Sequence, residues 1–399
     1  MHAPIDPAAT LCRVAPLFIE CGERLFPDLA ALFSGRVELG PQPVLRAWSP
    51  PAVEGVEIDA EEAAALALLS ASTPRALPEA WPVARRQRIL ARLLELGLVS
   101  RAPSERRLAQ WWPSAALYHF GSRWGGVTAR DRLPEDAASA EIAFECSRRQ
   151  LEQQTERLGP PPDHRVRLGN EDQSTDLPDT EPDPFDRLLA QRMTCRLFRR
   201  DRPLELACVA RLLRRSFGVL GVAALGGGHH AVRKSSPSGG GLHPIEPFVL
   251  AVEVEGLDCG WYHYRGDQHR LAPIRHLDPA VARRQVTALT AGQSYFASAP
   301  LAVALALRFR RHHWKYPVHA KALRVMLMEA GHVGQTFQLA ATHEGLGAFI
   351  TCAINEVDLD RELGLDGVEF GCIALLGAGW PDPEGHALQL DRYATYPED

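Results

Sequence analysis

Residues 235–253 read SSPSGGGLHPIEPFVLAVE, a glycine-rich loop that leads directly into an apolar run. The run at 247–255 has the length and composition of a buried strand. No Cβ intervenes at the glycines, so the backbone of Pro237, Ser238 and Gly239 could approach a flat ligand closely. A plain structural turn would explain the same residues. The loop lacks the Gly-Lys-Ser/Thr ending of a P-loop, and a strand follows it rather than the helix of a dinucleotide fingerprint.

Secondary-structure signals alternate along the rest of this half of the chain, which predicts an α+β layout with helices packed on a central sheet. The apolar patterns indicate helices over 204–217, 279–290 and 318–344, strands over 301–308 and 370–376, and a hairpin over 261–271. Upstream, residues 159–186 are rich in Pro, Asp and Gly and predict a linker, with an amphipathic bridging helix over 135–159 before it.

The N-terminal part predicts a compact, mostly helical unit over residues 55–105. Asp59 precedes an apolar run and Glu62 follows three residues later, a capping-box arrangement. A second helical pattern ends near Gly97, and an extended segment follows. With a short strand at 44–48, this is the element order of a winged helix, which could bind DNA, bind a peptide along its strand edge, or serve only as packing. We expect domains at 1–105, 106–180 and 181–399.

Composition excludes several classes of protein. The chain has 399 residues, 44 Lys and Arg against 49 Asp and Glu, and a net charge of −5, so we expect no general attraction to nucleic acid or anionic membranes. None of the eight cysteines forms a CxxC pair, and no stretch approaches ~20 apolar residues. The sequence therefore predicts a soluble, cytoplasmic protein. The adjacent pairs His229-His230 and His312-His313 diverge if they lie in strands, and we expect no metal site.

A basic motif precedes the glycine-rich loop. Arg192 and Arg196 flank Thr194 at alternate positions, so in an extended chain two guanidinium groups and a hydroxyl could project to one side and bind a phosphate. Arg199, Arg200 and Arg202 follow, and a basic surface would explain the run equally well.

A further candidate is Trp314-Lys315-Tyr316-Pro317, just before the long helix. Pro317 suits a first helical turn. Lys315 would then lie near the positive end of the helix dipole, which favours the neutral amine, and Tyr316 is a second proton-transfer group. A surface lysine beside a packed tyrosine is the alternative interpretation.

The long helix and the turn after it read VMLMEAGHVGQTFQLAATHEGLGAFITC over residues 325–352. Small residues along the helix, including Gly331 and Gly334, allow another helix or a ring to approach closely. Gly345 and Gly347 end the helix and redirect the backbone, so main-chain N–H groups there could face a ligand. An ordinary helix C-cap followed by a strand also explains these glycines.

Taken together, these motifs resemble the nitroreductase superfamily, and within it the SagB-type dehydrogenases of thiazole/oxazole-modified peptide synthesis. The resemblance covers about residues 181–399. Its most specific matches are PSGGGLHPIE, GWYHYR at 260–265, the Lys-Tyr pair at 315–316 and EAGHVGQTFQLAATHEGLGA. The resemblance implies a nitroreductase-like fold, with a central mixed sheet flanked by helices, and a winged-helix-like N-terminal domain. His243 stands where a tyrosine is common, and Pro317 where glycine is usual.

The same resemblance implies an FMN site. The family's Arg-x-Ser-x-Arg segment, which holds the FMN phosphate, corresponds to Arg192, Thr194 and Arg196, with threonine in place of serine. The Pro-Ser-Gly loop that lies along the flavin ring corresponds to Pro237, Ser238 and Gly239. By resemblance, further residues would complete the pocket and close its phosphate end, namely Gln335, Gly347, Ile350, Thr351, Gly377 and Gly379.

The resemblance also implies a reaction and partners. Lys315 and Tyr316 match the catalytic pair of azoline dehydrogenases, where a proton leaves the Cα of a thiazoline or oxazoline and a hydride passes to the flavin, giving an azole. The implied partners are a precursor peptide whose leader adds a strand to the N-terminal domain, a cyclodehydratase, and a second copy in a homodimer.

Two other functions remain open from the sequence. One keeps the flavin but reverses the chemistry, reducing a nitro group, quinone or dehydroamino acid with NAD(P)H. The other is a flavin-less scaffold subunit that presents a peptide. The Lys315-Tyr316 pair favours oxidation over the first, and the two arginines with the Pro-Ser-Gly loop disfavour the second.

Overall fold

The computed structural model describes residues 5–27, 36, 39–52, 54–103, 108–128, 140–163, 168–170 and 173–383. The chain forms two compact units. The first comprises Met1–Arg123 together with Arg310–Leu323, and the second comprises Trp124–Phe309 together with Arg324–Asp399. Residues 384–399 of the expected C-terminal domain lie outside the described residues.

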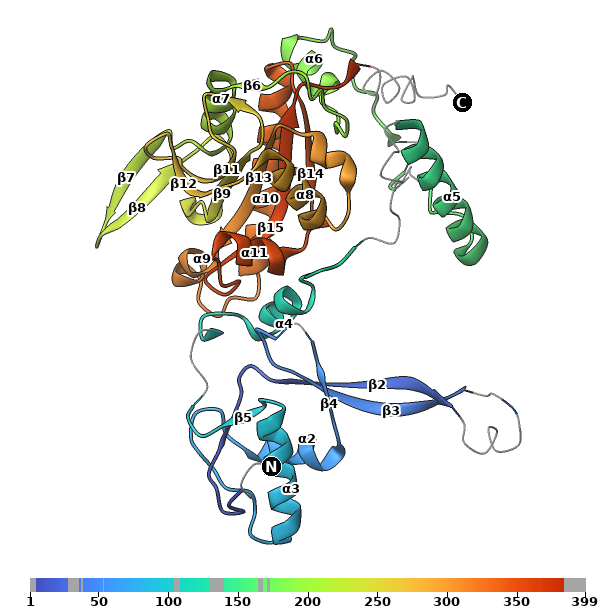
Figure 1. The fold of residues 1–399 in the computed structure, drawn as a ribbon, viewed down its shortest axis with the longest axis vertical. Coiled ribbons are helices and arrows are strands. Elements are labelled where there is room, and N and C mark those ends of the chain that lie inside the picture. Colours follow the sequence, from blue (N-terminus) through green and yellow to red (C-terminus); the bar gives the residue numbers. More distant parts are fainter. Residues whose placement is uncertain are drawn as a thin grey trace. The chain divides into compact units, whose positions relative to one another are not determined.

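The first unit combines small antiparallel sheets with short helices (Figure 1). Strands β2, β3 and β4 form one sheet in that order, and β1 pairs with β5 in another. Leu66 of α2 packs in one buried cluster with Ile89, Leu90 and Leu93 of α3, because apolar residues repeat at helical spacing. The bounds are β1 Cys12–Arg13, β2 Phe18–Pro27, β3 Leu39–Trp48, β4 Val56–Ile58, α2 Ala60–Leu68, α3 Val83–Glu95, β5 Val99–Ser100 and α4 Pro113–Gly121.

The start of α2 confirms the predicted capping box. The Asp59 side chain accepts a hydrogen bond from the Glu62 backbone N–H at 2.7 Å, and the Glu62 side chain accepts from the Asp59 N–H at 2.8 Å. Gly97 follows α3 at a φ of +67°, as expected of a left-handed helix stop. The long β2–β3 hairpin precedes both helices, and only its residues 44–48 were expected as strand. The winged-helix comparison stays a prediction.

A six-stranded sheet forms the centre of the second unit, in the order β12-β11-β9-β13-β15-β14 (Figure 1). The mixed sheet expected from the resemblance is wrong in one respect: each neighbouring pair in this sheet is antiparallel. At the edge of this sheet, an isolated parallel bridge joins Ala348 of β14 to Thr194. The strands are β9 Ile245–Ala251, β11 Gly260–Arg265, β12 Arg270–His276, β13 Leu301–Arg308, β14 Gly347–Thr351 and β15 Phe370–Gly379.

Helices cover both faces of this sheet. On one face, α8 and α11 share a buried cluster with Ala302, Ala304 and Ala306, which alternate along β13. On the other face, α10 comes so close that a Cβ at Gly334 would lie 2.7 Å from Ile350 Cδ1. The helices are α5 Ala140–Leu158, α6 Pro184–Gln191, α7 Leu206–Phe217, α8 Pro279–Leu289, α9 Phe309–Lys315, α10 Ala322–His343 and α11 Glu356–Leu363.

Two smaller sheets complete the described part of this unit. β6 Leu204–Glu205 pairs in parallel with β10 Val254–Glu255. β7 Gly221–Gly226 and β8 His229–Arg233 form an exposed hairpin that leads into the glycine-rich loop (Figure 1). Within the described residues, no helix is both long enough and apolar enough to cross a bilayer.

Candidate functional site

The Pro-Ser-Gly loop is a tight turn between β8 and β9. Gly240 and Gly241 adopt φ values of +68° and +67°, where residues with a Cβ are disfavoured. His243 also has a positive φ, of +45°. The Ser238 hydroxyl accepts a hydrogen bond from the His243 backbone N–H at 2.8 Å, which closes the turn on itself. The glycines are therefore required by backbone geometry.

Glu329 of α10 holds this loop from the outside. Its Oε1 accepts a hydrogen bond from the Gly239 N–H at 2.7 Å, and its carboxylate also bonds the Ser238 side chain. The side chain is 3% exposed. Burial raises the pKa of Glu329 above its ordinary value, although these hydrogen bonds act in the opposite direction. Sequence reasoning missed this residue; a lone acid within the small and apolar helix stretch LMEAG was the available signal.

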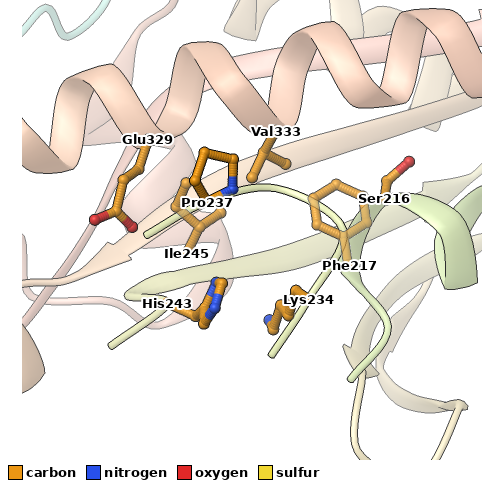
Figure 2. A pocket seen from close by; sticks show the side chains of 8 residues that line it. All are labelled: Ser216, Phe217, Lys234, Pro237, His243, Ile245, Glu329 and Val333. Atoms are coloured by element: carbon orange, nitrogen blue, oxygen red, sulfur yellow. The ribbon is translucent and has the colours of Figure 1, made fainter. Parts of the chain in front are cut away.

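A hollow opens beside the loop, with a volume of about 250 Å³ that includes space open to solvent. Figure 2 shows Glu329 and Val333 on the α10 side, Pro237 next to them, and His243 and Lys234 across from the helix. The hollow thus joins apolar walls to the side chains of an acid, a lysine and a histidine. The full lining is Ser216, Phe217, Lys234, Pro237, His243, Ile245, Glu329 and Val333.

The predicted phosphate-binding segment follows α6 and runs beside β14. The Cys195 N–H donates to the Ala348 carbonyl at 2.8 Å, within the parallel bridge at Thr194. Cys195 is buried, and burial raises its pKa to about 12, which keeps the thiol neutral. Arg196 beside it is exposed, and Thr194 is half-buried. Side chains alternate along an extended chain, so a buried Cys195 places Thr194 and Arg196 on the opposite side. Their contact with a phosphate stays a prediction.

The arginine segment and the Pro-Ser-Gly loop both contact α10. Arg192 Nη1 donates to Gln338 Oε1 at 3.2 Å, whereas the Pro-Ser-Gly loop bonds Glu329. Nine residues of helix separate Glu329 from Gln338, about 13 Å along the axis and half a turn around it. Both lie at margins of the buried face, and between these margins runs the exposed stripe of α10, formed by Arg324, Met328, Gly331 and Gln335.

The exposed stripe includes one of the expected site residues. Gln335 is exposed there. A Cβ at Gly331 would have no atom within 4 Å, so space is open above the helix. The structure therefore places the loop, the arginine segment and Gln335 around one helix.

The remaining predicted cofactor residues lie in β14 and β15, where packing accounts for them. A Cβ at Gly347 would lie 2.5 Å from that of Cys195. A Cβ at Gly377 would overlap the Phe349 ring, and one at Gly379 would overlap Pro300. Ile350 packs against Gly334, and Thr351 is buried and accepts from the Ala353 N–H. Their contact with a cofactor stays a prediction.

Lys315 and Tyr316 belong to the first unit, whereas the loop and the arginine segment belong to the second. The expected position before the long helix is wrong: Lys315 is the last residue of α9, and α10 begins only at Ala322. Pro317 therefore lies outside the first turn of α10, and the dipole argument for a neutral amine, which needs a helix N-terminus beside Lys315, does not apply. The catalytic role of the pair stays a prediction.

Buried histidines precede this pair in α9. His312 and His313 lie in a helix, not in the strand considered from the sequence, and are 1% and 2% exposed. Burial lowers the pKa of each to about 4. The His313 ring packs edge-on against Trp111 at 4.6 Å, and the His312 ring lies 5.2 Å from that of Tyr316. Among the described residues, no cluster of three or more His, Cys, Asp and Glu side chains could hold a metal ion.

An antiparallel sheet with helices on both faces, and a glycine-rich loop that leads into its strand β9, define an α+β protein. The sequence profile of the nitroreductase family matches residues 189–380. MJ1384 of Methanocaldococcus jannaschii, a protein named as a nitroreductase, is 30% identical over 171 residues, which are 43% of this chain and 79% of that protein. The chain belongs to the nitroreductase family and has its fold, which indicates an oxidoreductase.

A second relative is the trifolitoxin-processing protein TfxB of Rhizobium leguminosarum bv. trifolii. It is 32% identical over 140 residues, which are 35% of this chain and only 37% of TfxB. This chain thus matches little more than a third of that relative's length.

Similar solved structures include the Escherichia coli microcin synthetase McbBCD complex with truncated pro-MccB17 bound, at a TM-score of 0.44 and 20% identity, covering 57% of this chain and 80% of the other. A Desulfovibrio desulfuricans protein described as a nitroreductase, in complex with FMN, gives a TM-score of 0.35 and 18% identity, with coverages of 51% and 90%.

Proposed function

We propose that this protein is an FMN-dependent dehydrogenase that matures a ribosomally synthesised peptide by oxidising an azoline ring to an azole. The observation that carries the proposal is the placement of the Pro-Ser-Gly loop and the Arg192–Arg196 segment at the two margins of α10's buried face. The relative TfxB, named for trifolitoxin processing, supports the peptide substrate.

The donor chemistry of the second unit fits FMN. Arg192 and Arg196 supply guanidinium groups and Thr194 a hydroxyl, which suit a phosphate. At the other margin, the loop offers a backbone without side chains at its glycines, which a flat ring could approach closely. When bound, FMN would supply the hydride-accepting chemistry of the reaction. The chain's own contribution is to hold the cofactor and to orient the substrate.

Lys315 and Tyr316 would handle the proton. In this proposal the Lys315 amine takes the proton from the Cα of the azoline, and the Tyr316 hydroxyl orients the ring or shares that proton. The Lys315 Nζ lies 5.7 Å from the centre of the Tyr316 ring, so one substrate group could reach both side chains.

A second copy of the chain would cover the exposed stripe of α10. Met328 on this stripe is 59% exposed, its neighbour Leu327 is 38% exposed, and the space above Gly331 is open. Apolar side chains on an open helix face are typical of a surface that another protein covers. We therefore include a homodimer in the proposal.

The first unit would bind the precursor peptide. β2 pairs with β3 along one side only, and no strand among the described residues pairs with its other side. An extended leader peptide could add there as a further strand, with Ile19 and Leu25 exposed beside it. A cyclodehydratase that makes the azoline would be the natural partner, because its product is this substrate.

The family relationship to MJ1384 favours one alternative, an NAD(P)H-dependent flavin reductase of nitro, quinone or dehydroamino-acid substrates. Anaerobic stopped-flow absorbance separates the two functions. We expect a peptide azoline to bleach the flavin faster than NADPH does. Faster bleaching by NADPH would support the reductase instead, and a protein that binds no flavin would support a scaffold subunit.

The Lys315→Ala variant tests the assigned base. We expect it to keep FMN bound and to lose azoline-driven bleaching by at least about 100-fold, the usual contribution of a general base. Lys321→Ala, an exposed lysine six residues further on, is the matched control and should bleach normally. Loss of FMN in Lys315→Ala, or normal bleaching, would show that the role of Lys315 is misassigned.

A further inference from the structure

The Pro-Ser-Gly loop has little intrinsic rigidity. Three consecutive glycines follow Ser238, and two of them occupy left-handed conformations. Glycine loses more conformational entropy on ordering than any other residue, so a free loop of this composition would sample many shapes. Something outside the loop must fix the one that is observed.

Glu329 and Thr336 of α10 form hydrogen bonds with the loop. Glu329 accepts the Gly239 N–H at 2.7 Å and bonds the Ser238 side chain. Two turns further along the same helix, the Thr336 hydroxyl shares a 2.8 Å hydrogen bond with that of Ser236. Glu329 holds the loop at two consecutive residues, Ser238 and Gly239, whereas Thr336 holds it at Ser236.

We propose that Glu329 is a positioning residue that fixes the Pro-Ser-Gly loop in its cofactor-binding shape. The reach of its carboxyl oxygen, rather than its negative charge, is what the loop requires. The cofactor part of this inference rests on the proposed function, whereas the effect on the loop does not. Without that oxygen the Gly239 N–H loses its partner in a half-buried site, which is costly.

Three substitutions at Glu329 distinguish the effect of its side-chain length from the effect of its negative charge. Glu329→Gln keeps the acceptor oxygen at full length but removes the charge, so the loop should stay ordered. Glu329→Asp keeps the charge but withdraws the oxygen by one C–C bond, about 1.5 Å, so the loop should loosen. Glu329→Ala removes both. Glu344→Gln is the control just beyond the C-terminal end of α10, since Glu344 bonds Arg211 and Arg215 of α7 instead of the loop.

The first readout is amide hydrogen exchange across residues 236–243 of the full chain without FMN. Loss of one hydrogen bond predicts roughly tenfold faster exchange in Glu329→Asp and Glu329→Ala, and less than about threefold in Glu329→Gln. Exchange in Glu344→Gln should match that of the wild type. The inference fails if Glu329→Gln loosens the loop more than Glu329→Asp does, or if none of the variants changes exchange.

The second readout is the FMN dissociation constant from quenching of flavin fluorescence. We expect the variants to follow the same order in FMN binding. Glu329→Asp should bind FMN roughly tenfold more weakly than the wild type, and Glu329→Gln should bind it within about threefold of the wild type. If the wild type binds no FMN, the proposed function fails while the exchange result still decides the role of Glu329. If the wild type binds FMN and all variants bind equally, the positioning role is overturned.

Discussion

At the scale of single residues, glycines divide into two kinds in this protein. Gly240 and Gly241 are required by their left-handed backbone. Gly347, Gly377 and Gly379 are required by close neighbours, because a Cβ would meet a packed side chain or ring. In a sequence, a glycine that is required by a close neighbour cannot be told from a glycine that makes room for a ligand, because neither carries a side chain.

The Gly377→Ala substitution tests this distinction. Its Cβ would overlap the Phe349 ring, which itself stacks on Phe296 at 3.7 Å, so the sheet must shift to accept it. Overpacking of this kind predicts a loss of about 1–3 kcal/mol in the free energy of unfolding, measured by denaturant titration. Gly331→Ala, in open space on a helix, should be neutral or stabilising. Unchanged stability with weaker FMN binding would instead place Gly377 at the cofactor.

Buried histidines predict an acid-sensitive first unit. The folded-state pKa of His312 is lowered to about 4 from an ordinary 6.5, first by burial and then by His319 and Lys315. A lowered pKa contributes stability that is present above about pH 6.5 and is lost as the pH falls through about 4. When the pH is lowered from about 6.5 to about 4, the melting temperature of His312→Leu should therefore fall by several degrees less than that of the wild type. Tryptophan fluorescence during heating measures both melting temperatures. Parallel melting curves at both pH values would contradict this.

Local motifs could be recognised from the sequence, whereas contacts between distant residues could not. The Pro-Ser-Gly loop and the alternation around Cys195 were visible in short stretches. Glu329 was missed because its partner Gly239 is 90 residues away and no motif links them. Lys315 was placed at the wrong helix end because the short helix α9 directly follows a strand and offers no capping signal.

At the scale of elements, the amphipathic helices followed their patterns closely. The apolar repeat of α3 and the capping box of α2 were both predicted, since each depends on neighbours within one or two turns. The β7–β8 hairpin and the short helix α11 were not predicted. The hairpin carries small residues and glycines on exposed strands and so lacks the alternation that marks a half-buried strand.

The capping box makes a prediction for α2. Burial raises the pKa of Asp59, but the Glu62 N–H and Arg88 lower it more, so the net pKa is lowered and the carboxylate stays charged. Asp59→Ala should destabilise the helix start by about 1 kcal/mol. Faster amide exchange at residues 61–63 would show it. Glu79→Ala, an exposed acid between the two helices, should leave that exchange unchanged; an equal effect in both variants would rule out the cap as the cause.

At the scale of the whole molecule, the chain does not divide where its composition changes. Residues 310–323 belong to the first unit although they lie deep in the second half of the sequence. The Val318 N–H donates to the Gln110 carbonyl at 2.8 Å, a contact between residues more than 200 positions apart. No local pattern encodes such a pairing, so sequence reasoning placed this segment with the C-terminal domain.

The two units also divide the proposed chemistry. The second unit carries the candidate cofactor residues, and the first carries Lys315, Tyr316 and the side of β2 that no described strand pairs with. In the proposed enzyme the fold thus separates the binding of the redox group from the handling of the peptide and its proton. Because the candidate cofactor residues all lie in the second unit, FMN binding can be measured without knowing the peptide substrate.

The most direct test is a titration of the full chain with FMN, followed by flavin fluorescence. We predict saturable quenching that reaches one FMN per chain, weakened at least roughly tenfold when Arg192 and Arg196 are both replaced by alanine. Flavin fluorescence that stays unquenched in the presence of excess protein would contradict the proposal that this chain binds FMN.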